Sequence, residues 1–166
     1  MVDSIEVDEI HHPMVIHQRR LITDGEGAGE NRGAPGMCVE FGPVDCDMEL
    51  GYVSDGSMNP AKGTRGGLVA APASHYIRTR DGSLKEMPDV SAQFVLEEGE
   101  SIISNTAGGG GYGSPLSRDP GRVGKDVKEG WVSVERAFEV YGVVLNSEGR
   151  VDFTATNERR DHMTTP

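Results

Sequence analysis

The chain has 166 residues, the usual length of one domain, and its 16 Lys and Arg residues against 27 Asp and Glu residues give a net charge of −11. Nucleic-acid affinity comes mainly from cationic side chains that displace counterions from phosphates, so this charge argues against a nucleic-acid partner. Hydrophobic residues make up 36% of the chain and glycine occurs 23 times, which predicts a loop-rich domain or one that borrows a partner's surface.

The N-terminal residues show no sign of a targeting or metal-binding segment. Met1–Ile10 is acidic where a secretory signal would be basic and then apolar, and no apolar run approaches the roughly 20 residues that span a bilayer. We therefore expect a cytoplasmic protein without a membrane partner. His11, His12 and His17 are metal-type ligands, but Pro13 breaks any shared helical face, so we expect an exposed stretch and no metal site.

The first two thirds of the chain favour β-strands. An alternating pattern predicts a strand over Met14–Thr23, although neither of its faces is purely apolar. Gly36–Phe41 and Val44–Val53 are expected to form a hairpin across the tight Gly42-Pro43 link. Further short strands are predicted at Leu68–Arg78, Ser91–Leu96 and Glu100–Thr106.

This hairpin would place the two cysteines on opposite faces. With Gly42-Pro43 as the loop, Val39 faces Cys46, whereas Cys38 lies on the other face, opposite Asp47. Residues on opposite faces do not direct their β-carbons at each other. We therefore expect two reduced thiols, which fits a cytoplasmic protein.

The last third of the chain has helical patterns. Asp119-Pro120 supplies an N-cap acceptor and a preset φ, and this helix is expected to end near Gly130. Ser133 can cap a second helix, and Gly142 follows its end. Asp152 can cap a final helical turn or two. The expected apolar residues of the second helix are Val134, Ala137, Phe138 and Tyr141.

These elements predict an α+β, mainly β fold. It would be a single glycine-rich β domain with two or three short helices in the C-terminal third. The domain is expected to cover residues 1–160 and to be followed by a polar tail at residues 161–166. We find no internal repeat and no second domain.

The most distinctive local motif is GGGGYG at Gly108–Gly113, which satisfies G-x-G-x-x-G after a predicted strand. A dinucleotide fingerprint needs the helix to begin inside the motif, so that its amides reach the pyrophosphate. Here Ser114-Pro115 intervenes and the first helix signal is Asp119-Pro120, so we reject that interpretation. Consecutive glycines can still expose N–H groups to an anion or let another backbone approach closely, and both roles stay open.

No complete catalytic set is visible in the sequence. The carboxylates of Glu97–Glu100 surround a turn, and Asp45, Asp47 and Glu49 alternate along the outer face of a strand, so neither group is an acid/base pair. The chain has no GxSxG motif and no G-x-x-x-x-G-K-[ST] motif.

Three segments nevertheless follow one another in a recognisable order. Asp24–Gly36 reads DGEGAGENRGAPG and is similar to D-S-G-G-A-G-x-x-R-G-G-x-G; Gly63–Gly67 is similar to G-x-x-G-G. Asn105–Leu145 is similar to P-G-G-G-G-Y-G-D-P followed by R-D-P, D-V-x-x-G and Y-G-V. Together these segments resemble the C-terminal part of the hydantoinase B/oxoprolinase family. Gly25-Glu26 stands where that family commonly has Ser-Gly.

The family includes N-methylhydantoinase B, the B-type half of oxoprolinase and the corresponding subunits of acetone and acetophenone carboxylases. The resemblance implies an ATP-dependent hydrolase or carboxylase complex that acts on a lactam, hydantoin or ketone through a phosphorylated intermediate. It implies two partners, a hydantoinase A-like ATP-binding subunit and the N-terminal part of a hydantoinase B-like subunit. ATP and a divalent metal are expected on these partners and no cofactor on this chain, which alone would be inactive.

Two further functions stay open beside an enzyme subunit. The chain could serve as a non-catalytic structural subunit that stabilises larger catalytic subunits, or as a β-rich module that binds anions. The sequence does not choose between hydrolysis and carboxylation, and it identifies neither the substrate nor the catalytic residues.

The resemblance also implies a ligand or interface loop. Tyr112 would be a hydroxyl donor or a packing wedge, and Arg32 and Arg118 would bind an anion or clamp loops. In the alternative, the glycines allow tight packing and both arginines hold carboxylates. The candidate residues are Gly27, Gly29, Arg32, Gly33, Gly66, Gly67, Gly108, Gly109, Gly110, Gly111, Tyr112, Gly113 and Arg118.

Overall fold

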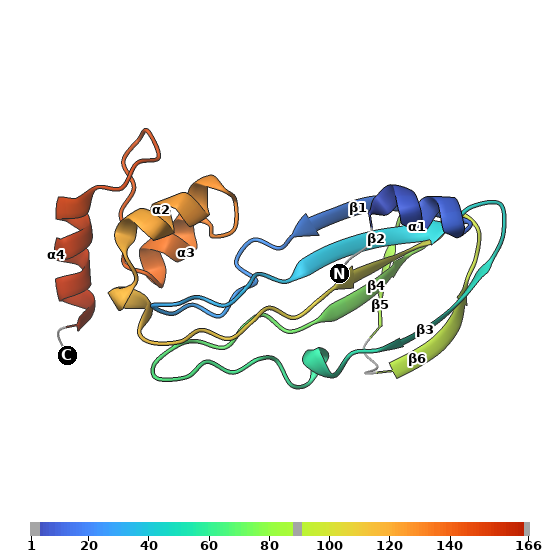
Figure 1. The fold of residues 1–166 in the computed structure, drawn as a ribbon, viewed down its shortest axis with the longest axis horizontal. Coiled ribbons are helices and arrows are strands. Elements are labelled where there is room, and N and C mark those ends of the chain that lie inside the picture. The colour runs from blue at the N-terminus through green and yellow to red at the C-terminus, as the bar shows by residue number, and fades with distance from the viewer. Residues whose placement is uncertain (1–3, 88–90, 165–166) are drawn as a thin grey trace. The chain divides into compact units, whose positions relative to one another are not determined.

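A computed structural model describes residues 4–87 and 91–164 (Figure 1). The chain forms two compact units, each assembled from three separate stretches. Unit 1 contains Met1–Leu21, Met37–Asn59 and Pro72–Thr106. Unit 2 contains Ile22–Gly36, Pro60–Ala71 and Ala107–Pro166.

Unit 1 is built on a five-stranded antiparallel sheet in the order β1-β2-β7-β4-β5. Cys38, Ile102 and Ile103 from its central strands are buried. A separate antiparallel pair joins β3 to β6, in which Met48 lies opposite Leu96. The strands are β1 (Met14–Leu21), β2 (Met37–Pro43), β3 (Met48–Val53), β4 (Ser74–Arg78), β5 (Leu84–Glu86), β6 (Ser91–Leu96) and β7 (Ser101–Asn105).

The predicted hairpin between residues 36–41 and 44–53 is wrong. Strand β2 pairs with β1 and β7, whereas β3 pairs with β6. Gly42 does not turn the chain, because it lies opposite Val15 in the β1 pairing, where a Cβ would overlap the carbonyl of Glu100. Cys38 accordingly lies opposite Arg20 and Asn105 rather than Asp47.

The expectation of two reduced thiols is confirmed, although the register that suggested it is wrong. Cys38 is buried and Cys46 is half-buried, and neither forms a disulfide. Cys38 lies in β2, whereas Cys46 lies in the link between β2 and β3 and belongs to no strand.

The N-terminal segment is a helix, which the sequence analysis did not anticipate. Helix α1 covers Ile5–His11, and the Ser4 side chain accepts the N–H of Val7 at its start. An ion pair of 2.9 Å between Asp8 and Arg19 joins this helix to β1. The N-terminal stretch that was predicted to be exposed is therefore an ordered helix, held by its Ser4 cap and by the ion pair to β1.

Three other strand predictions agree with the observed strand bounds to different degrees. The prediction of Ser91–Leu96 is confirmed as β6, and β7 lies within the predicted Glu100–Thr106. The predicted strand Leu68–Arg78 begins only at Ser74, because residues 68–71 belong to unit 2 and bond there to irregular segments.

The helices of unit 2 begin where the capping signals predicted. Asp119 caps α2 (Pro120–Lys128) and Ser133 caps α3 (Val134–Glu139). Helix α4 covers Phe153–Thr164, which is longer than the expected turn or two. Single 3-10 turns lie at Asp55–Ser57 in unit 1 and at Pro115–Ser117 in unit 2.

The core of unit 2 is small and lies around α2 and α3. Val123, Ala137 and Tyr141 are fully buried there, together with Ala28 from the first glycine-rich segment. The predicted apolar face of α3 is only partly correct, because Val134 and Phe138 are 59% and 42% exposed. Helix α3 has six residues, and the one that is buried in the core is Ala137.

The α+β, mainly β fold class is confirmed, with three short helices in the C-terminal third. The expectation of one domain over residues 1–160 stays a prediction, since two compact units can still unfold as one. Within the described part of the chain, no helix has the length and apolar character needed to cross a membrane.

Candidate functional site

Three glycine-rich segments meet in unit 2 although they are far apart in the sequence. Residues 22–36, 60–71 and 107–113 run beside one another and are joined by backbone hydrogen bonds. The N–H of Gly27 donates to the carbonyl of Gly109 over 2.8 Å, and the N–H of Gly111 donates to the carbonyl of Leu68 over 3.0 Å. The segments that carry the family resemblance therefore form one continuous structure.

Most amides of the GGGGYG loop already have backbone partners. Because such an N–H already donates a hydrogen bond to a carbonyl, it is not available to an anion. The packing role of these glycines is therefore what the contacts support, while the assignment as a ligand or interface loop stays a prediction. The donors and acceptors are Gly108 to Ala71, Gly109 to Ala34, Gly111 to Leu68, Tyr112 to Asn31 and Gly113 to Thr64.

The close approach of these segments leaves no space for side chains. A Cβ at Gly33 would overlap the carbonyl of Gly109, and a Cβ at Gly110 would overlap the carbonyl of Lys62. Gly27, Gly29 and Gly67 stand against backbone atoms of the same segments. These residues are glycines because three main chains pack directly against one another.

Gly66 and Tyr112 lie at the surface of this structure. Gly66 is exposed and has a φ of 91°, in a turn where the N–H of Gly67 donates to the carbonyl of Thr64. The Tyr112 side chain is 42% exposed, and the Arg65 guanidinium lies 5.7 Å from the centre of its ring. Among the predicted loop residues these two are exposed, whereas the others are half-buried or buried.

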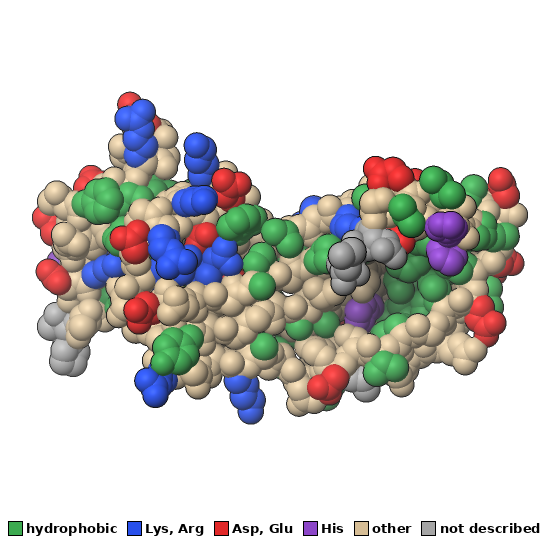
Figure 2. Space-filling view, viewed as in Figure 1, with side chains coloured by type: hydrophobic (Ala, Val, Ile, Leu, Met, Phe, Trp, Pro, Cys, Tyr) green, Lys and Arg blue, Asp and Glu red, His purple; other side chains and the backbone are tan. Residues whose placement is uncertain are grey.

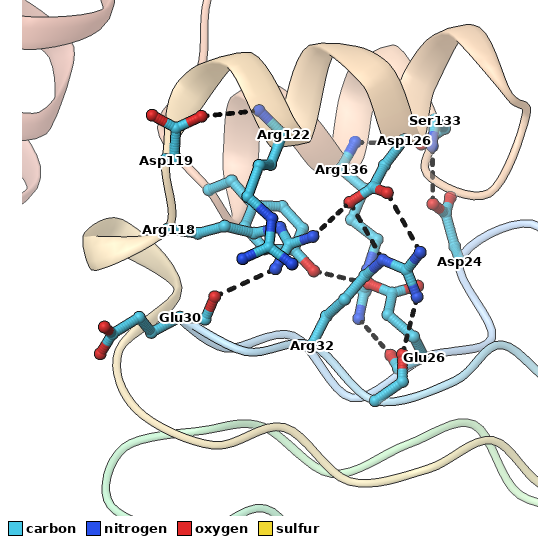
Figure 3. A network of polar contacts seen from close by, with 12 residues as sticks. Asp24, Glu26, Glu30, Arg32, Arg118, Asp119, Arg122, Asp126, Ser133 and Arg136 are labelled. Carbon is cyan, nitrogen blue, oxygen red and sulfur yellow. Dashed lines mark hydrogen bonds and ion pairs between the residues drawn. The ribbon is translucent and has the colours of Figure 1, made fainter.

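Arg32 and Arg118 meet on one buried carboxylate, that of Asp126 (Figure 3). Arg32 donates to both Asp126 oxygens, each over 3.0 Å, and Arg118 donates to Oδ2 over 2.8 Å. This hydrogen bonding to Asp126 raises the pKa of Arg32 above its usual value. Arg118 also donates to the carbonyl of Glu30 over 3.0 Å, so it ties the first segment to α2.

The alternative in which Arg32 and Arg118 hold carboxylates agrees with these contacts, but the sequence did not identify Asp126 as their shared partner. Asp126 is the first residue of the D-V-x-x-G match, which was the available signal. Asp126 is 4% exposed, and charged groups buried to this extent in proteins are paired with opposite charges.

A second buried carboxylate, Glu26, lies in the same network. Its Oε1 accepts the Nε–H of Arg136 over 2.8 Å and the hydroxyl of Tyr141 over 3.0 Å. Burial, and then the charge of Glu26, raise the pKa of Tyr141 above its usual value. Asp24 in the same segment accepts the N–H of Ser133 over 2.7 Å and so fixes the start of α3.

A cavity of about 320 Å³ opens beside the Asp126 network. Its lining includes Arg122 and Lys125 from α2 and the indole of Trp131, which has the Arg32 guanidinium 5.0 Å from its ring centre. Arg32, Arg118, Asn31 and Asp126 complete the lining. The predicted arginines therefore line a cavity that contains four cationic side chains and one carboxylate.

The described residues contain no group of three or more His, Cys, Asp and Glu side chains that could hold a metal ion. Because these residues offer no cluster of ligands for the divalent metal that the family resemblance implies, we assign no step to a metal on this chain. The expectation that cofactors reside on partner subunits stays a prediction.

Comparisons with known proteins by sequence and by structure point to the same family. The family described as hydantoinase B/oxoprolinase matches residues 1–115. The beta chain of the caprolactamase of Pseudomonas jessenii is 33% identical over 163 residues, which cover 96% of this chain and 28% of the relative. The B-type component of a putative D-/L-hydantoinase of Pseudomonas sp. NS671 is 29% identical over 159 residues, covering 95% of this chain and 27% of the relative.

The crystal structure of the ATP-dependent caprolactamase from Pseudomonas jessenii is similar to this structure, with a TM-score of 0.76 and 30% identity. The similarity covers 97% of this chain and 28% of that one. A nucleotide-free acetone carboxylase structure has a TM-score of 0.71 at 22% identity, covers 98% of this chain and 26% of that one, and supports the fold alone.

These matches confirm the resemblance that the glycine-rich segments suggested. The chain spans little more than a quarter of the length of the relatives it matches. The family match covers residues 1–115, and the relatives extend the similarity through the helices of unit 2. The chain belongs to the hydantoinase B/oxoprolinase family.

Proposed function

We propose that this chain is part of the B-type component of an ATP-dependent amidohydrolase or carboxylase. The observation that carries the proposal is the similarity of nearly the whole chain, in sequence and in fold, to an ATP-dependent caprolactamase. The acting enzyme would contain a hydantoinase A-like subunit that binds ATP and the remaining part of a hydantoinase B-like subunit.

We favour hydrolysis of a cyclic amide over carboxylation of a ketone. Identity to the caprolactamase beta chain is 33%, against 23% to the acetone carboxylase alpha subunit of Xanthobacter autotrophicus. ATP would transfer its terminal phosphoryl group to the amide oxygen and leave as ADP. Water would attack the carbon of this O-phosphorylated amide more readily than that of an unactivated amide, and phosphate would leave as the C–N bond breaks. ATP and its metal would be bound by the partners.

Within this enzyme, unit 2 would act as a rigid platform. Its three segments are joined through backbone hydrogen bonds, and its buried carboxylates hold Arg32, Arg118 and Arg136 in fixed positions. The same contacts support the second candidate, a structural subunit that stabilises its partners without touching substrate.

Omission of the chain from the complex distinguishes these two functions. The complex is purified from its source, its subunits are identified by native mass spectrometry, and ATP-dependent hydrolysis of cyclic amides and hydantoins is measured. Acetone with bicarbonate is the carboxylation control. We expect the partners to assemble without this chain but to lose turnover, which its addition restores.

Loss of assembly together with turnover would support the structural candidate instead. Turnover by this chain alone, or turnover that does not require ATP, would contradict the proposed function altogether.

A further inference from the structure

We propose that the cavity beside the Asp126 network is a binding site for a small oxyanion of the phosphate type, either free phosphate or a small phosphate monoester. This inference rests on the cavity itself and does not depend on the proposed enzyme. The sequence suggested an anion at the amides of the GGGGYG loop or at Arg32 and Arg118, and the cavity adds Arg122 and Lys125 to these two arginines.

The charge of the cavity is opposite to that of the chain. Its lining carries four cations and one carboxylate, so 4 − 1 = +3, while the whole chain has a net charge of −11. Figure 2 shows Lys and Arg side chains gathered in the part of unit 2 where Figure 1 draws α2 and α3. A concave site lined by one sign of charge concentrates counterions of the other sign.

Two of these cations are not used by the fold. Arg32 and Arg118 hold Asp126, but the side chains of Arg122 and Lys125 form no ion pair with any residue of 4–87 or 91–164. Both residues are exposed on α2 and line the cavity. These two cations and the two arginines repel one another, and an anion among them would relieve that repulsion.

A buried donor points to the same ligand. Arg118 is 3% exposed, and its Nε–H has no hydrogen-bond partner among the described residues, although both of its terminal nitrogens are bonded. Buried N–H groups are nearly always satisfied. An oxyanion in the cavity, which Arg118 lines, would pair with Arg122 and Lys125 and would place a hydrogen-bond acceptor near this donor.

The size and charge of the site select a small ligand. A volume of about 320 Å³ lies at the lower end for small-molecule sites, which are typically ~300–1,000 Å³. The net negative charge outside the cavity would repel a polyanion such as nucleic acid. Phosphate has several oxygens for donors in different directions, and arginine forks bind it in a bidentate manner.

Trp131 provides a specific test, because it is the only tryptophan of the chain and it lines the cavity. Inorganic phosphate is titrated into the full 166-residue chain at constant ionic strength, and tryptophan fluorescence is recorded. We expect a saturable change that chloride does not produce. A phosphate-dependent rise in the unfolding midpoint is the second readout, which detects binding that leaves fluorescence unchanged.

Substitution of Lys125 has a matched control on the same helix. Lys125→Gln is expected to weaken phosphate binding about tenfold, and the combined Arg122→Gln and Lys125→Gln variant should weaken it further. Lys128→Gln removes an equally exposed charge from α2 that does not line this cavity, so it should leave affinity unchanged. Circular dichroism confirms that each variant folds.

Each outcome decides for or against the site. Tighter binding of glycerol phosphate would identify a phosphate monoester, and tighter binding of inorganic phosphate would identify the free ion. Equal binding of acetate would overturn the assignment to phosphate. Equal losses in Lys125→Gln and Lys128→Gln, or no saturable response in either readout, would overturn the site.

Discussion

At the scale of single residues, Asp126 connects parts of the chain that are distant in sequence. It receives three N–H donors from Arg32 and Arg118, on either side of a gap of more than eighty residues. A carboxylate in this position offsets one of two positive charges and so reduces the repulsion between the guanidinium groups. Its removal leaves both cations without this counter-charge, with Arg118 only 3% exposed and Arg32 half-buried.

We therefore expect Asp126→Asn to lower the free energy of unfolding by about 3 to 5 kcal/mol, which is the usual cost of breaking a buried ion pair. Urea unfolding followed by circular dichroism measures this loss. Glu129→Gln removes an exposed carboxylate at the end of the same helix and is the control. Similar stability of the two variants would contradict the importance of the network.

Glu40 makes the stability of unit 1 depend on pH. Its carboxylate accepts hydrogen bonds from Arg78, Ser101 and Gln18, and the bond from Arg78 is the main reason that its pKa falls from 4.5 to about 2. Because the pKa is lower in the folded state, the contribution of Glu40 is complete above about pH 4.5 and is lost as the pH falls towards 2.

The stability of the natural chain should accordingly decrease more steeply between about pH 5 and about pH 2 than that of Glu40→Gln, because the variant lacks this titration. Free energies of unfolding at several pH values in this interval provide the measurement. Glu86→Gln, at an exposed position on β5, should retain the natural pH dependence. Parallel curves for all three proteins would exclude a special role for Glu40.

At the scale of elements, the glycine-rich segments show that order does not require regular helices or strands. Their backbone bonds join three stretches that have few side chains to pack. Hydrophobic burial contributes little here, so the stability of the structure depends on close contact of main chains. An added methyl group should therefore have a large effect where the chains touch and little effect elsewhere.

Gly110→Ala is expected to destabilise the chain by about 1 to 3 kcal/mol, because its Cβ would overlap the carbonyl of Lys62. Gly51→Ala is the control, since a Cβ at that position in β3 meets nothing within 4 Å. Differential scanning calorimetry should show a lower midpoint for the first variant only. A tolerated Gly110→Ala would show that the segments can separate without loss of stability.

The sequence predicted elements best where their signals are local. Asp119 and Ser133 cap helices through bonds to residues three positions away, and both helix starts are confirmed. The hairpin failed because β2 finds its partners in β1 and β7, which are distant along the chain. Strand partners depend on tertiary packing, which alternation of side chains does not specify.

In the candidate site, too, local motifs were recognised in the sequence but contacts between distant residues were not. Family motifs identified Arg32 and Arg118, but neither pattern nor spacing indicated that both bind one carboxylate. Arg122, Lys125 and Trp131 were not identified from the sequence. The first two are ordinary polar residues of α2, and Trp131 follows the end of that helix. Only the fold brings them to one cavity.

At the scale of the whole molecule, the short length relative to the family members matters most. The chain covers 28% of the caprolactamase beta chain, and it exposes large apolar side chains. Several exceed two thirds exposure, which is a liability for aggregation unless partners cover them. These residues include Ile10 at 79%, Val53 at 84% and Met58 at 70%.

The isolated chain is therefore expected to associate with itself and to bind a hydrophobic dye more strongly than the same chain in a complex with its partners. Sedimentation velocity and dye fluorescence measure these properties. A soluble monomer that unfolds cooperatively and binds no dye would indicate that the chain is complete without partners.

The alternation of the chain between its two units has a consequence for synthesis on the ribosome. Unit 1 needs residues up to Thr106, and unit 2 needs the last stretch, which begins at Ala107. The first two glycine-rich stretches therefore emerge from the exit tunnel well before the third can join them. Bonds such as that from the N–H of Leu68 to the carbonyl of Ala28 can form without the third stretch. The groups that pair with residues 107–113 remain hydrated or bound to a chaperone until then, and a nascent chain that stalls before Ala107 would leave them unpaired.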